Sequence, residues 1–385
     1  MIDKDTIPKH WEIKQLSDIG EIISGGTPST KVPSYWNGNI SWITPADLSG
    51  YSEKSICRGK KSITEQGLKN SSARLMPKNS VLFSSRAPIG YVVISSNELC
   101  TNQGFKSIVP GKSVNVEFLF YYLKSSKNIA ENAASGTTFK EISSKKFSKL
   151  EIPLPPLSEQ QQIVSKIEEL FSELDKGKQQ LDTVKQQFKT YRQAVLKWAF
   201  EGRFKQNTEY WRQTTLGEII SISSGINLSK SKRDDKGDFL VYGGNGPTGR
   251  HSEYMFEDEK FIIGRVGAHC GNAHITKPKS WITDNAFVVS FNKDEIYIRF
   301  LLYLINFLEL NNYSSSTAQP VISQGKIYPI GILLPPLDEQ LNVTREIETR
   351  LSVCDKMEET IENSLRQVES LRQSILKQAF EGKLL

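Results

Sequence analysis

The chain has 385 residues, of which 38% are hydrophobic and 10% aromatic, so it can build packed cores and is not a disordered protein. Its length exceeds one ordinary core and predicts two or three domains. No apolar run approaches the roughly 18 residues of a membrane span, and no signal peptide is visible. Four scattered cysteines predict reduced thiols in a cytoplasmic protein.

The net charge of +6 is concentrated in the first part of the chain. Residues 1–157 carry 20 basic and 13 acidic side chains, residues 205–337 carry 14 and 13, and residues 338–385 carry 7 and 10. A basic segment is compatible with contacts to nucleic-acid phosphates, but many surfaces that bind nothing carry the same excess. Charge alone therefore does not decide between these two possibilities.

Residues 1–154 are predicted to form a first globular domain. Its recurring landmarks are a Trp-x4-Leu opening at Trp11, an arginine loop around Arg86 and an apolar run at 118–123. These apolar runs of four to six residues, bounded by Gly, Pro, Asn and Ser, are typical of strands.

A long helix is predicted for residues 155–204. The prolines at 155–156 cannot continue a helix backward, Ser158 and Gln161 have the spacing of a capping box, and Gly202 is a natural stop. Apolar residues at 4,3 spacing specify a coiled-coil seam over five heptads, with Gly177, Tyr191 and Val195 in the same frame. The predicted seam residues are Ile163, Ile167, Leu170, Leu174, Leu181, Val184 and Phe188.

Residues 205–334 are predicted to form a second domain that repeats the first. The Trp11 opening returns at Trp211, the Arg86 loop at Arg265, and the run at 118–123 at 300–304. The stretch between Trp36 and Arg86 has no counterpart of the second domain's segment 242–250. Each domain thus keeps a scaffold while its loops diverge, as one fold that reads two ligands would require.

The segment 335–385 repeats the central helix at an offset of 180 residues. Pro-Pro-Leu-Ser-Glu-Gln at 155–160 returns as Pro-Pro-Leu-Asp-Glu-Gln at 335–340, and Ala-Phe-Glu-Gly at 199–202 returns at 379–382. Nothing is inserted or lost between these matches, so the helix length is kept, as in a spacer of roughly 60–65 Å. The second predicted seam contains Val343, Ile347, Met357, Ile361, Val368 and Leu371.

Two matched seams can pair within one chain or drive homodimerisation. We favour pairing within the chain, because a long helix with one apolar seam needs a partner and the other copy is already tethered to it. If a pseudo-twofold axis relates the halves, the helices run antiparallel with one domain at each end. The predicted fold is α+β, with two pseudo-twofold-related globular domains joined by two long antiparallel helices that form an intramolecular coiled coil.

The repeated helix starts and ends, the two Trp-x4-Leu openings and Tyr-Gly-Gly-Asn-Gly at 242–246 cover the whole chain. In this order they resemble the DNA specificity subunit of type I restriction-modification systems. The resemblance implies that the globular parts are target recognition domains, each reading one half of a bipartite site in double-stranded DNA. It implies that the helices fix the spacer between the half-sites. It also implies docking of two methyltransferase subunits, which bind S-adenosylmethionine, and of restriction-motor subunits, with no cofactor on this chain.

Side chains that read bases match the hydrogen-bonding groups of a base edge, as Arg and Lys donors do for guanine and the Asn and Gln amides do for adenine. Arg86 and Arg265 match across the repeat, which favours phosphate positioning, whereas diverged residues such as Lys60 and Arg250 are better candidates for specificity. For each candidate the alternative is a solvated loop side chain. The candidates are Lys60, Lys61, Arg86, Asn102, Gln103, Thr137, Thr138 and Lys140 in the first domain, and Asn245, Arg250, Arg265, His269, Asn272, Asn285 and Gln319 in the second.

Catalytic and metal-binding motifs are not predicted. The segment 244–251 resembles a P-loop but has Arg-His where Lys-(Ser/Thr) is required. His269, Cys270 and His274 lack a second ligand pair at zinc-site spacing. The tetrapeptide Asn/Asp-Pro-Pro-Tyr of amino-methylating enzymes is missing, so we expect a non-catalytic subunit whose partners methylate and cleave DNA. The alternative function is a coiled-coil scaffold or adaptor whose domains bind protein.

Overall fold

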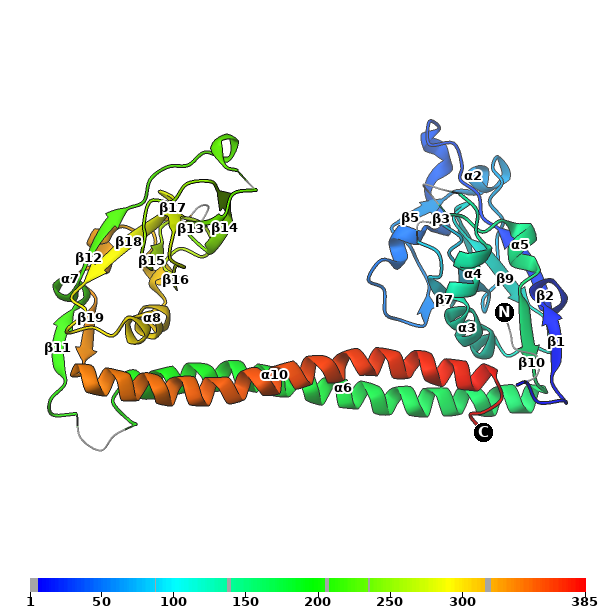
Figure 1. Cartoon of the computed structure of the whole chain (residues 1–385). Coiled ribbons are helices and arrows are strands. Elements are labelled where there is room, and N and C mark those ends of the chain that lie inside the picture. The colour runs from blue at the N-terminus through cyan, green and yellow to red at the C-terminus, as the bar shows by residue number, and fades with distance from the viewer. Residues whose placement is uncertain (1–5, 87, 137–139, 205–207, 235, 316–319) are drawn as a thin grey trace. The chain divides into compact units, whose positions relative to one another are not determined.

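The computed structural model describes residues 6–86, 88–136, 140–204, 208–234, 236–315 and 320–385. The chain divides into two compact units, one formed by residues 1–180 with 364–385 and the other by residues 181–363. Two helices of 44 residues each, α6 (Leu157–Phe200) and α10 (Leu337–Phe380), contribute to both units (Figure 1). Among the described helices, none is long and apolar enough to cross a membrane.

The first unit holds the first domain, from β1 to β10. Its strands form a pair β1-β10, a five-stranded sheet β2-β9-β6-β7-β4 and a three-stranded sheet β5-β3-β8. The elements are β1 (Glu12–Gln15), α1 (Leu16–Ile19), β2 (Gly20–Ser24), η1 (Pro33–Tyr35), β3 (Trp36–Ile43), η2 (Pro45–Leu48), β4 (Ser55–Ile56), β5 (Lys61–Ile63), α2 (Glu65–Lys69), β6 (Val81–Phe83), β7 (Val92–Ser95), β8 (Leu99–Thr101), β9 (Lys106–Pro110), α3 (Val116–Ser125), α4 (Lys127–Ala133), α5 (Ser144–Ser148) and β10 (Glu151–Leu154).

The second unit holds the second domain, from β11 to β19, and repeats this plan. A pair β11-β19 accompanies a four-stranded sheet β12-β18-β15-β16 and a three-stranded sheet β14-β13-β17. The elements are β11 (Arg212–Thr215), α7 (Leu216–Ile219), β12 (Ile220–Ser224), η3 (Lys230–Lys232), β13 (Phe239–Gly243), β14 (Gly246–His251), β15 (Phe261–Gly264), β16 (Ala273–Ile275), β17 (Ser280–Ile282), β18 (Ala286–Phe291), α8 (Ile298–Phe307), η4 (Leu310–Tyr313), α9 (Gln324–Ile327) and β19 (Gly331–Leu334). The α+β prediction is confirmed.

The strand prediction for 118–123 and 300–304 is wrong, because both runs are helical. All six residues from Phe118 to Leu123 in α3 are apolar or aromatic and buried, so this run contains no polar position and does not show the 3.6-residue period. The signal that marks it as a helix lies just before the run, where Asn115 Oδ1 accepts from the backbone N of Phe118 at 2.8 Å.

Each long helix starts with a Glu-Gln pair that ties it to the domain that precedes it. Nε1 of Trp11 donates to Oε1 of Glu159 at 2.9 Å, and Nε1 of Trp211 donates to Oε2 of Glu339 at 2.7 Å. These contacts explain why the Trp-x4-Leu openings and the helix starts recur together. The predicted capping box is wrong, because α6 begins at Leu157 and Ser158 already lies inside the helix.

The glutamines that follow are fully buried and satisfied on both sides of the amide. In the first unit, Gln160 accepts from the backbone N of Asn115 at 2.8 Å and donates to the Ser113 carbonyl at 3.0 Å. In the second unit, Gln340 accepts from the backbone N of Tyr297 at 2.8 Å and donates to the Glu295 carbonyl at 2.8 Å. Both glutamines therefore hold the loop that leads into α3 or α8.

Each long helix ends on the other domain. Phe200, at the end of α6, packs against Phe300 at 5.5 Å between ring centroids in the second unit. Phe380, at the end of α10, packs against Phe118 at 5.2 Å in the first unit. The glycines two residues later have φ of +72° and +69°, a left-handed conformation that ends a helix.

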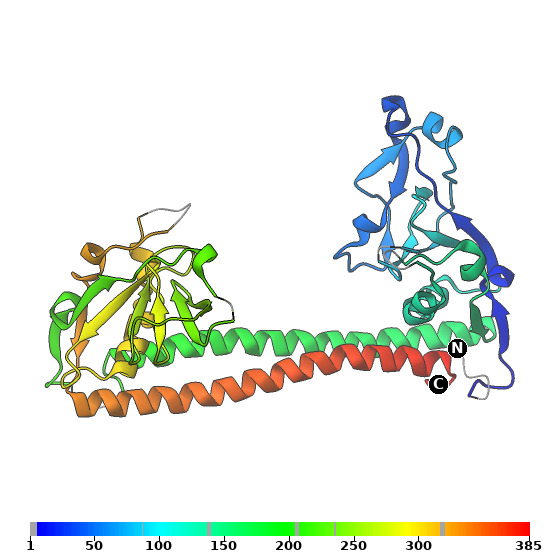
Figure 2. The same cartoon turned by 45° about the horizontal axis from the view of Figure 1, so that its top comes forward.

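Within each unit α6 and α10 run antiparallel (Figure 1, Figure 2). In the second unit, Lys185 pairs with Glu362 at 3.0 Å and Arg192 pairs with Asp355 at 2.5 Å, so rising numbers on one helix meet falling numbers on the other. In the first unit Arg372 pairs with Asp175. The predicted pairing within one chain is confirmed.

Ten of the thirteen predicted seam residues are buried or half-buried, and three are exposed. Val184, Met357 and Leu371 are exposed, at 36%, 50% and 49%. Arg372 faces the partner helix in place of its neighbour Leu371, because an α-helix drifts against a strict 3.5-residue repeat. The buried members are Ile163, Ile167, Val343, Ile347 and Ile361, and the half-buried ones are Leu170, Leu174, Leu181, Phe188 and Val368.

Candidate functional site

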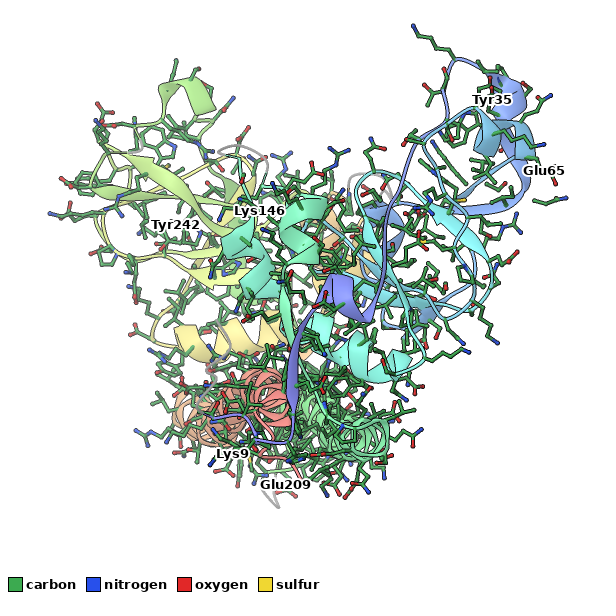
Figure 3. The ribbon with its side chains drawn as sticks, turned by 90° about the vertical axis from the view of Figure 1, so that its right-hand side faces the viewer. Lys9, Tyr35, Glu65, Lys146, Glu209 and Tyr242 are labelled. Atoms are coloured by element: carbon green, nitrogen blue, oxygen red, sulfur yellow. The ribbon has the colours of Figure 1, made fainter. Side chains whose placement is uncertain are left out.

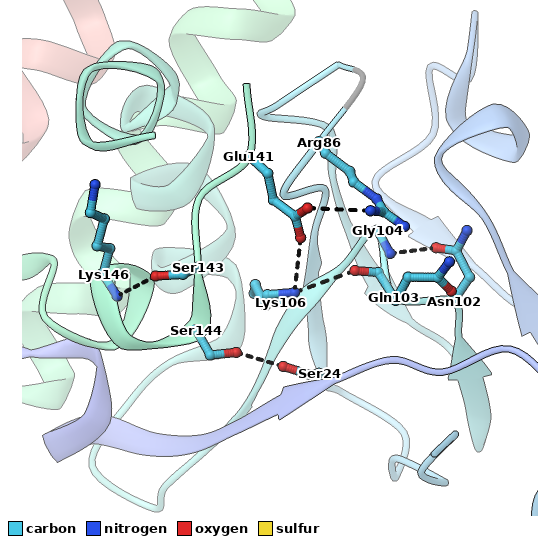
Figure 4. A network of polar contacts seen from close by, with 10 residues as sticks. All are labelled: Ser24, Arg86, Asn102, Gln103, Gly104, Lys106, Glu141, Ser143, Ser144 and Lys146. Atoms are coloured by element: carbon cyan, nitrogen blue, oxygen red, sulfur yellow. Dashed lines mark hydrogen bonds and ion pairs between the residues drawn. The ribbon is translucent and has the colours of Figure 1, made fainter. Parts of the chain in front are cut away.

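An ionic cluster lies at the start of β9 in the first domain (Figure 4). Oε2 of Glu141 lies 3.3 Å from Nη1 of Arg86, and Oε1 lies 3.6 Å from Nζ of Lys106. The Lys106 ammonium also donates to the Gln103 carbonyl at 3.3 Å. Only 8% of the Lys106 side chain is exposed, and this burial lowers its pKa against the opposing effect of Glu141.

Asn102 and Gln103 form the turn that leads into this cluster. Oδ1 of Asn102 accepts from the backbone N of Gly104 at 2.9 Å, so this side chain shapes the turn. Gln103 is exposed, and its Oε1 accepts from the Thr27 hydroxyl. The predicted residues Arg86, Asn102 and Gln103 thus lie together around Lys106.

The segment between α4 and α5 contains Glu141 and so contributes to the same cluster. Nζ of Lys146 donates to Oγ of Ser135 at 2.6 Å, and Oγ of Ser144 lies 2.6 Å from Oγ of Ser24 on β2. Lys140 is exposed in this segment. The candidates Thr137 and Thr138 lie outside the described residues.

Lys61 is the first residue of β5 in the three-stranded sheet of the first domain, and Lys60 directly precedes that strand. Both are exposed, and Nζ of Lys61 lies 5.6 Å from the centroid of the Trp36 ring. Trp36 follows η1, and Tyr35 of η1 lies on the same part of the first unit as Glu65 of α2 (Figure 3). Lys61 therefore belongs to a different sheet from Lys106, and Lys60 lies just before that sheet.

Arg265 occupies the matching region of the second domain without an acidic partner. Its guanidinium lies 5.5 Å from the Phe287 ring centroid and donates to Oγ of Ser224 at 3.4 Å. No carboxylate lies within 4.0 Å of it among the residues that the structure describes. An open pocket of about 440 Å³ adjoins it, lined by Ser224, Arg265, Phe287, Val321, Ile322, Ser323, Gln324 and Gly325.

Three further candidates surround the end of β15 beside Arg265. The Asn285 carbonyl accepts from the backbone N of Arg265 at 2.9 Å, and the Asn272 carbonyl accepts from the N of Gly264 at 2.8 Å. His269, Asn272 and Asn285 are all exposed. The structure therefore brings these residues together with Arg265.

The remaining candidates of the second domain lie on or beyond the β13–β14 hairpin. Asn245 is exposed in its turn. Arg250 donates from Nε to the Gly237 carbonyl at 2.7 Å and from Nη2 to the Asp238 carbonyl at 2.9 Å, so its guanidinium holds the local backbone. Gln319 lies outside the described residues.

The predicted match between Arg86 and Arg265 is wrong by one residue. The backbone N of Ile142 donates to the Ser85 carbonyl at 3.1 Å, and the N of Ile322 donates to the Arg265 carbonyl at 3.0 Å. Ser85 is therefore equivalent to Arg265, and the two arginines project from neighbouring backbone positions. A short shared sequence at a loop cannot distinguish two registers that differ by one residue.

Sequence reasoning missed Lys106 and Glu141. Lys106 lies in a strand whose next two residues, Ser107 and Ile108, are fully buried. Because lysine is rarely buried unless it is paired, a lysine beside buried strand residues indicates an ion pair. Within the described ranges, no three His, Cys, Asp or Glu residues form a group that could hold a metal. The glycine-rich segment from Gly246 to His251 is a strand, β14.

Comparisons with known proteins agree along the whole chain. The family model described as "Type I restriction modification DNA specificity domain" matches residues 8–186 and 208–369. The type I restriction enzyme EcoprrI specificity subunit of Escherichia coli is 27% identical over 93% of this chain and 90% of its own length. The MjaIX specificity subunit of Methanocaldococcus jannaschii is 46% identical over 42% of this chain, and the match spans only 38% of that relative.

Two solved structures share the fold. One, titled "Structural basis underlying complex assembly and conformational transition of the type I R-M system", has a TM-score of 0.77, 22% identity, and coverage of 98% of this chain and 99% of its own. The crystal structure of the HsdS subunit from Thermoanaerobacter tengcongensis has a TM-score of 0.62, 20% identity, and coverage of 98% of both chains.

Proposed function

Since the chain belongs to the family of type I restriction-modification DNA specificity subunits, we propose that each of its two domains reads one half of a bipartite DNA site. The observation that carries this proposal is the repeated scaffold with different side chains at equivalent places. The first domain offers Arg86 beside Glu141, and the second offers Arg265 beside an open pocket. Different groups on one scaffold would contact two different half-sites.

The two long helices would set the length of unread DNA between the half-sites. Each has 44 residues, begins with a Glu-Gln pair bonded to one domain and ends with a phenylalanine packed on the other. A helix that is fixed at both ends transmits any change in its length to the domains. This role of the helices accounts for the constant offset of 180 residues.

The chain would act without catalysis of its own. We expect two methyltransferase subunits, which carry S-adenosylmethionine, and restriction-motor subunits to assemble with it and to modify or cleave the DNA. The E. coli and M. jannaschii relatives are named as specificity subunits of restriction enzymes, which supports this division of labour. The scaffold or adaptor alternative is not favoured, because the family match covers both domains.

Sequencing of methylated motifs in the host tests the proposal. The expected motif has two short specified parts separated by an unspecified spacer, and it disappears when the gene for this chain is deleted. A full chain with the Arg265→Ala substitution should bind a duplex of that motif more weakly, with a smaller salt dependence, because one phosphate contact is lost. A motif that persists after the deletion would contradict the proposal.

A further inference from the structure

Glu141 holds Arg86 through both its side chain and its backbone. Its carboxylate contacts Nη1 of Arg86 at 3.3 Å and lies 3.6 Å from Nζ of Lys106. Its backbone forms isolated β-bridges to Arg86 and to Ser135. Glu141 therefore contacts both the backbone and the guanidinium of Arg86.

The second domain builds the same place from apolar residues. Val266 and Val321 form the β-bridge that Arg86 and Glu141 form in the first domain. Phe287 pairs with Ser224 across the sheet as Lys106 pairs with Ser24. The apolar set Val266, Phe287 and Val321 thus stands where the first domain has Arg86, Lys106 and Glu141.

This replacement shows that the fold does not require the ionic cluster. Replacement of a buried ion pair by well-packed apolar residues of similar size is often neutral or stabilising, and Lys106 is the buried member here. The cluster of the first domain therefore calls for an explanation other than stability.

The cluster presents one net positive charge at the surface. Lys106 is 8% exposed and cannot reach a ligand, so its charge serves to balance Glu141. Arg86 is 37% exposed and uses one nitrogen on the carboxylate, whereas a guanidinium has five N–H donors. The remaining donors are held in one orientation, which reduces the entropy lost when they bind an anion.

We propose that Glu141 is a positioning residue for DNA binding by the first domain, which orients Arg86 so that its remaining N–H groups bind a phosphate of the DNA backbone. The inference rests on the proposed function, since it assigns a role within the reading of one half-site. Glu141 itself would not touch the DNA.

Binding of the full chain to a fluorescent duplex, measured by anisotropy across a salt series, tests this role. The duplex carries the motif found in the host methylome. We expect R86Q to weaken binding about tenfold and to reduce the salt slope by about one. E141Q should weaken binding by about threefold to tenfold, and the double variant R86Q/E141Q should bind no more weakly than R86Q alone, because Glu141 acts through Arg86.

Two further variants separate positioning from charge and from folding. E131Q removes an acidic charge from α4, where Glu131 contacts Lys127 at 4.0 Å and not Arg86, and it should leave binding unchanged or slightly tighter. K106F/E141V copies the Phe287 and Val321 of the second domain, so it should retain the melting temperature of the wild type and still bind as weakly as E141Q.

Binding by E141Q at the wild-type affinity or tighter would overturn the inference, as would additive losses in R86Q/E141Q. Wild-type binding by K106F/E141V would also overturn it, because the backbone around Arg86 would then position its guanidinium without the Glu141 carboxylate. These outcomes test the inference on the condition that the wild-type chain binds its motif more tightly than a scrambled duplex. A wild-type chain without that preference overturns the proposed function itself, and the inference with it.

Discussion

Arg192 on α6 pairs with Asp355 on α10 at 2.5 Å, and the residues 180 positions away, Arg372 and Asp175, form the same pair. The first pair lies in the second unit and the other in the first unit. Each arginine directly follows a predicted seam residue, Tyr191 or Leu371, and faces the partner helix where a regular coiled coil would have an apolar residue. The helix pair is thus joined by a repeated polar contact at equivalent points.

These arginines can be replaced by leucine without loss of stability. Their side chains are 26% and 22% exposed, and ion pairs of this kind contribute about 0.2–1 kcal/mol. Leucine at a seam position packs well, so R192L/R372L should melt at the wild-type temperature or a few degrees higher. Calorimetry of this variant checks the prediction, and a markedly lower melting temperature would show that the ion pairs contribute more than exposed pairs usually do.

The buried glutamines at the helix starts should be far more sensitive than their neighbours. Gln160→Ala would leave the backbone N of Asn115 and the Ser113 carbonyl without their partner, at a cost of about 2–4 kcal/mol. Gln340→Ala should have a similar effect in the second unit. Gln161→Ala, an exposed position one residue along α6, is the matched control and should change the unfolding free energy by less than about 0.5 kcal/mol. Denaturant melts that gave equal losses for Gln160 and Gln161 would contradict this account.

A glycine just after α10 and a glycine inside α6 should respond to alanine in opposite directions. A Cβ at Gly382, which has φ of +69°, would lie 2.3 Å from Cγ of Pro8, so G382A should destabilise the first unit by about 1 kcal/mol or more. Gly177 has open space around its Cβ position and lies inside α6, so G177A should stabilise by about 0.5–1 kcal/mol. Thermal melts of the two variants give the comparison, and a shift of both in one direction would contradict it.

The length of the helices should set the spacer of the recognised site. A heptad inserted at matching points of α6 and α10 adds about 10 Å, which corresponds to about three base pairs. Methylome sequencing of a strain with this variant should show the same half-sites with a longer spacer. Insertion into α6 alone is the control, since it breaks the register between Arg192 and Asp355 and should abolish modification. A spacer of unchanged length would contradict the proposal that the two helices set it.

The four thiols should differ sharply in reactivity. Cys57 is exposed, whereas Cys100, Cys270 and Cys354 are buried. Burial raises the pKa of Cys100 to about 12, so almost none of its reactive thiolate forms near neutral pH. Iodoacetamide at pH 8 should therefore modify Cys57 first, and C57S should take up little reagent until it is unfolded. Mass spectrometry of tryptic peptides reads this out, and rapid labelling of Cys100 would show that its strand opens.

The repeat predicted the arrangement of the chain because the helix starts and ends carry the contacts that join helix to domain. Trp11, Gln160 and Gly202 each make a contact that constrains the residue type, so they survive in both copies. The seam was predicted less well at Leu371, since an apolar residue beside an arginine gives no sign of which one faces the partner. The run at 118–123 was misread because its burial on every side erased the helical period. Glu141 was not found, because its contacts with Arg86 and Lys106 join residues that are far apart in the sequence and meet only in the folded domain.

The first unit is assembled from both ends of the sequence. When residue 363 has left the ribosome, every segment of the second unit is present, whereas the first unit still lacks residues 364–385. Until those residues arrive, Phe118 and Tyr122 lack the contact with Phe380 that covers them in the finished protein. The domain that is synthesised first is therefore the last to be completed, and until then it lacks part of its aromatic core, the kind of incomplete packing that makes a folding chain prone to aggregation.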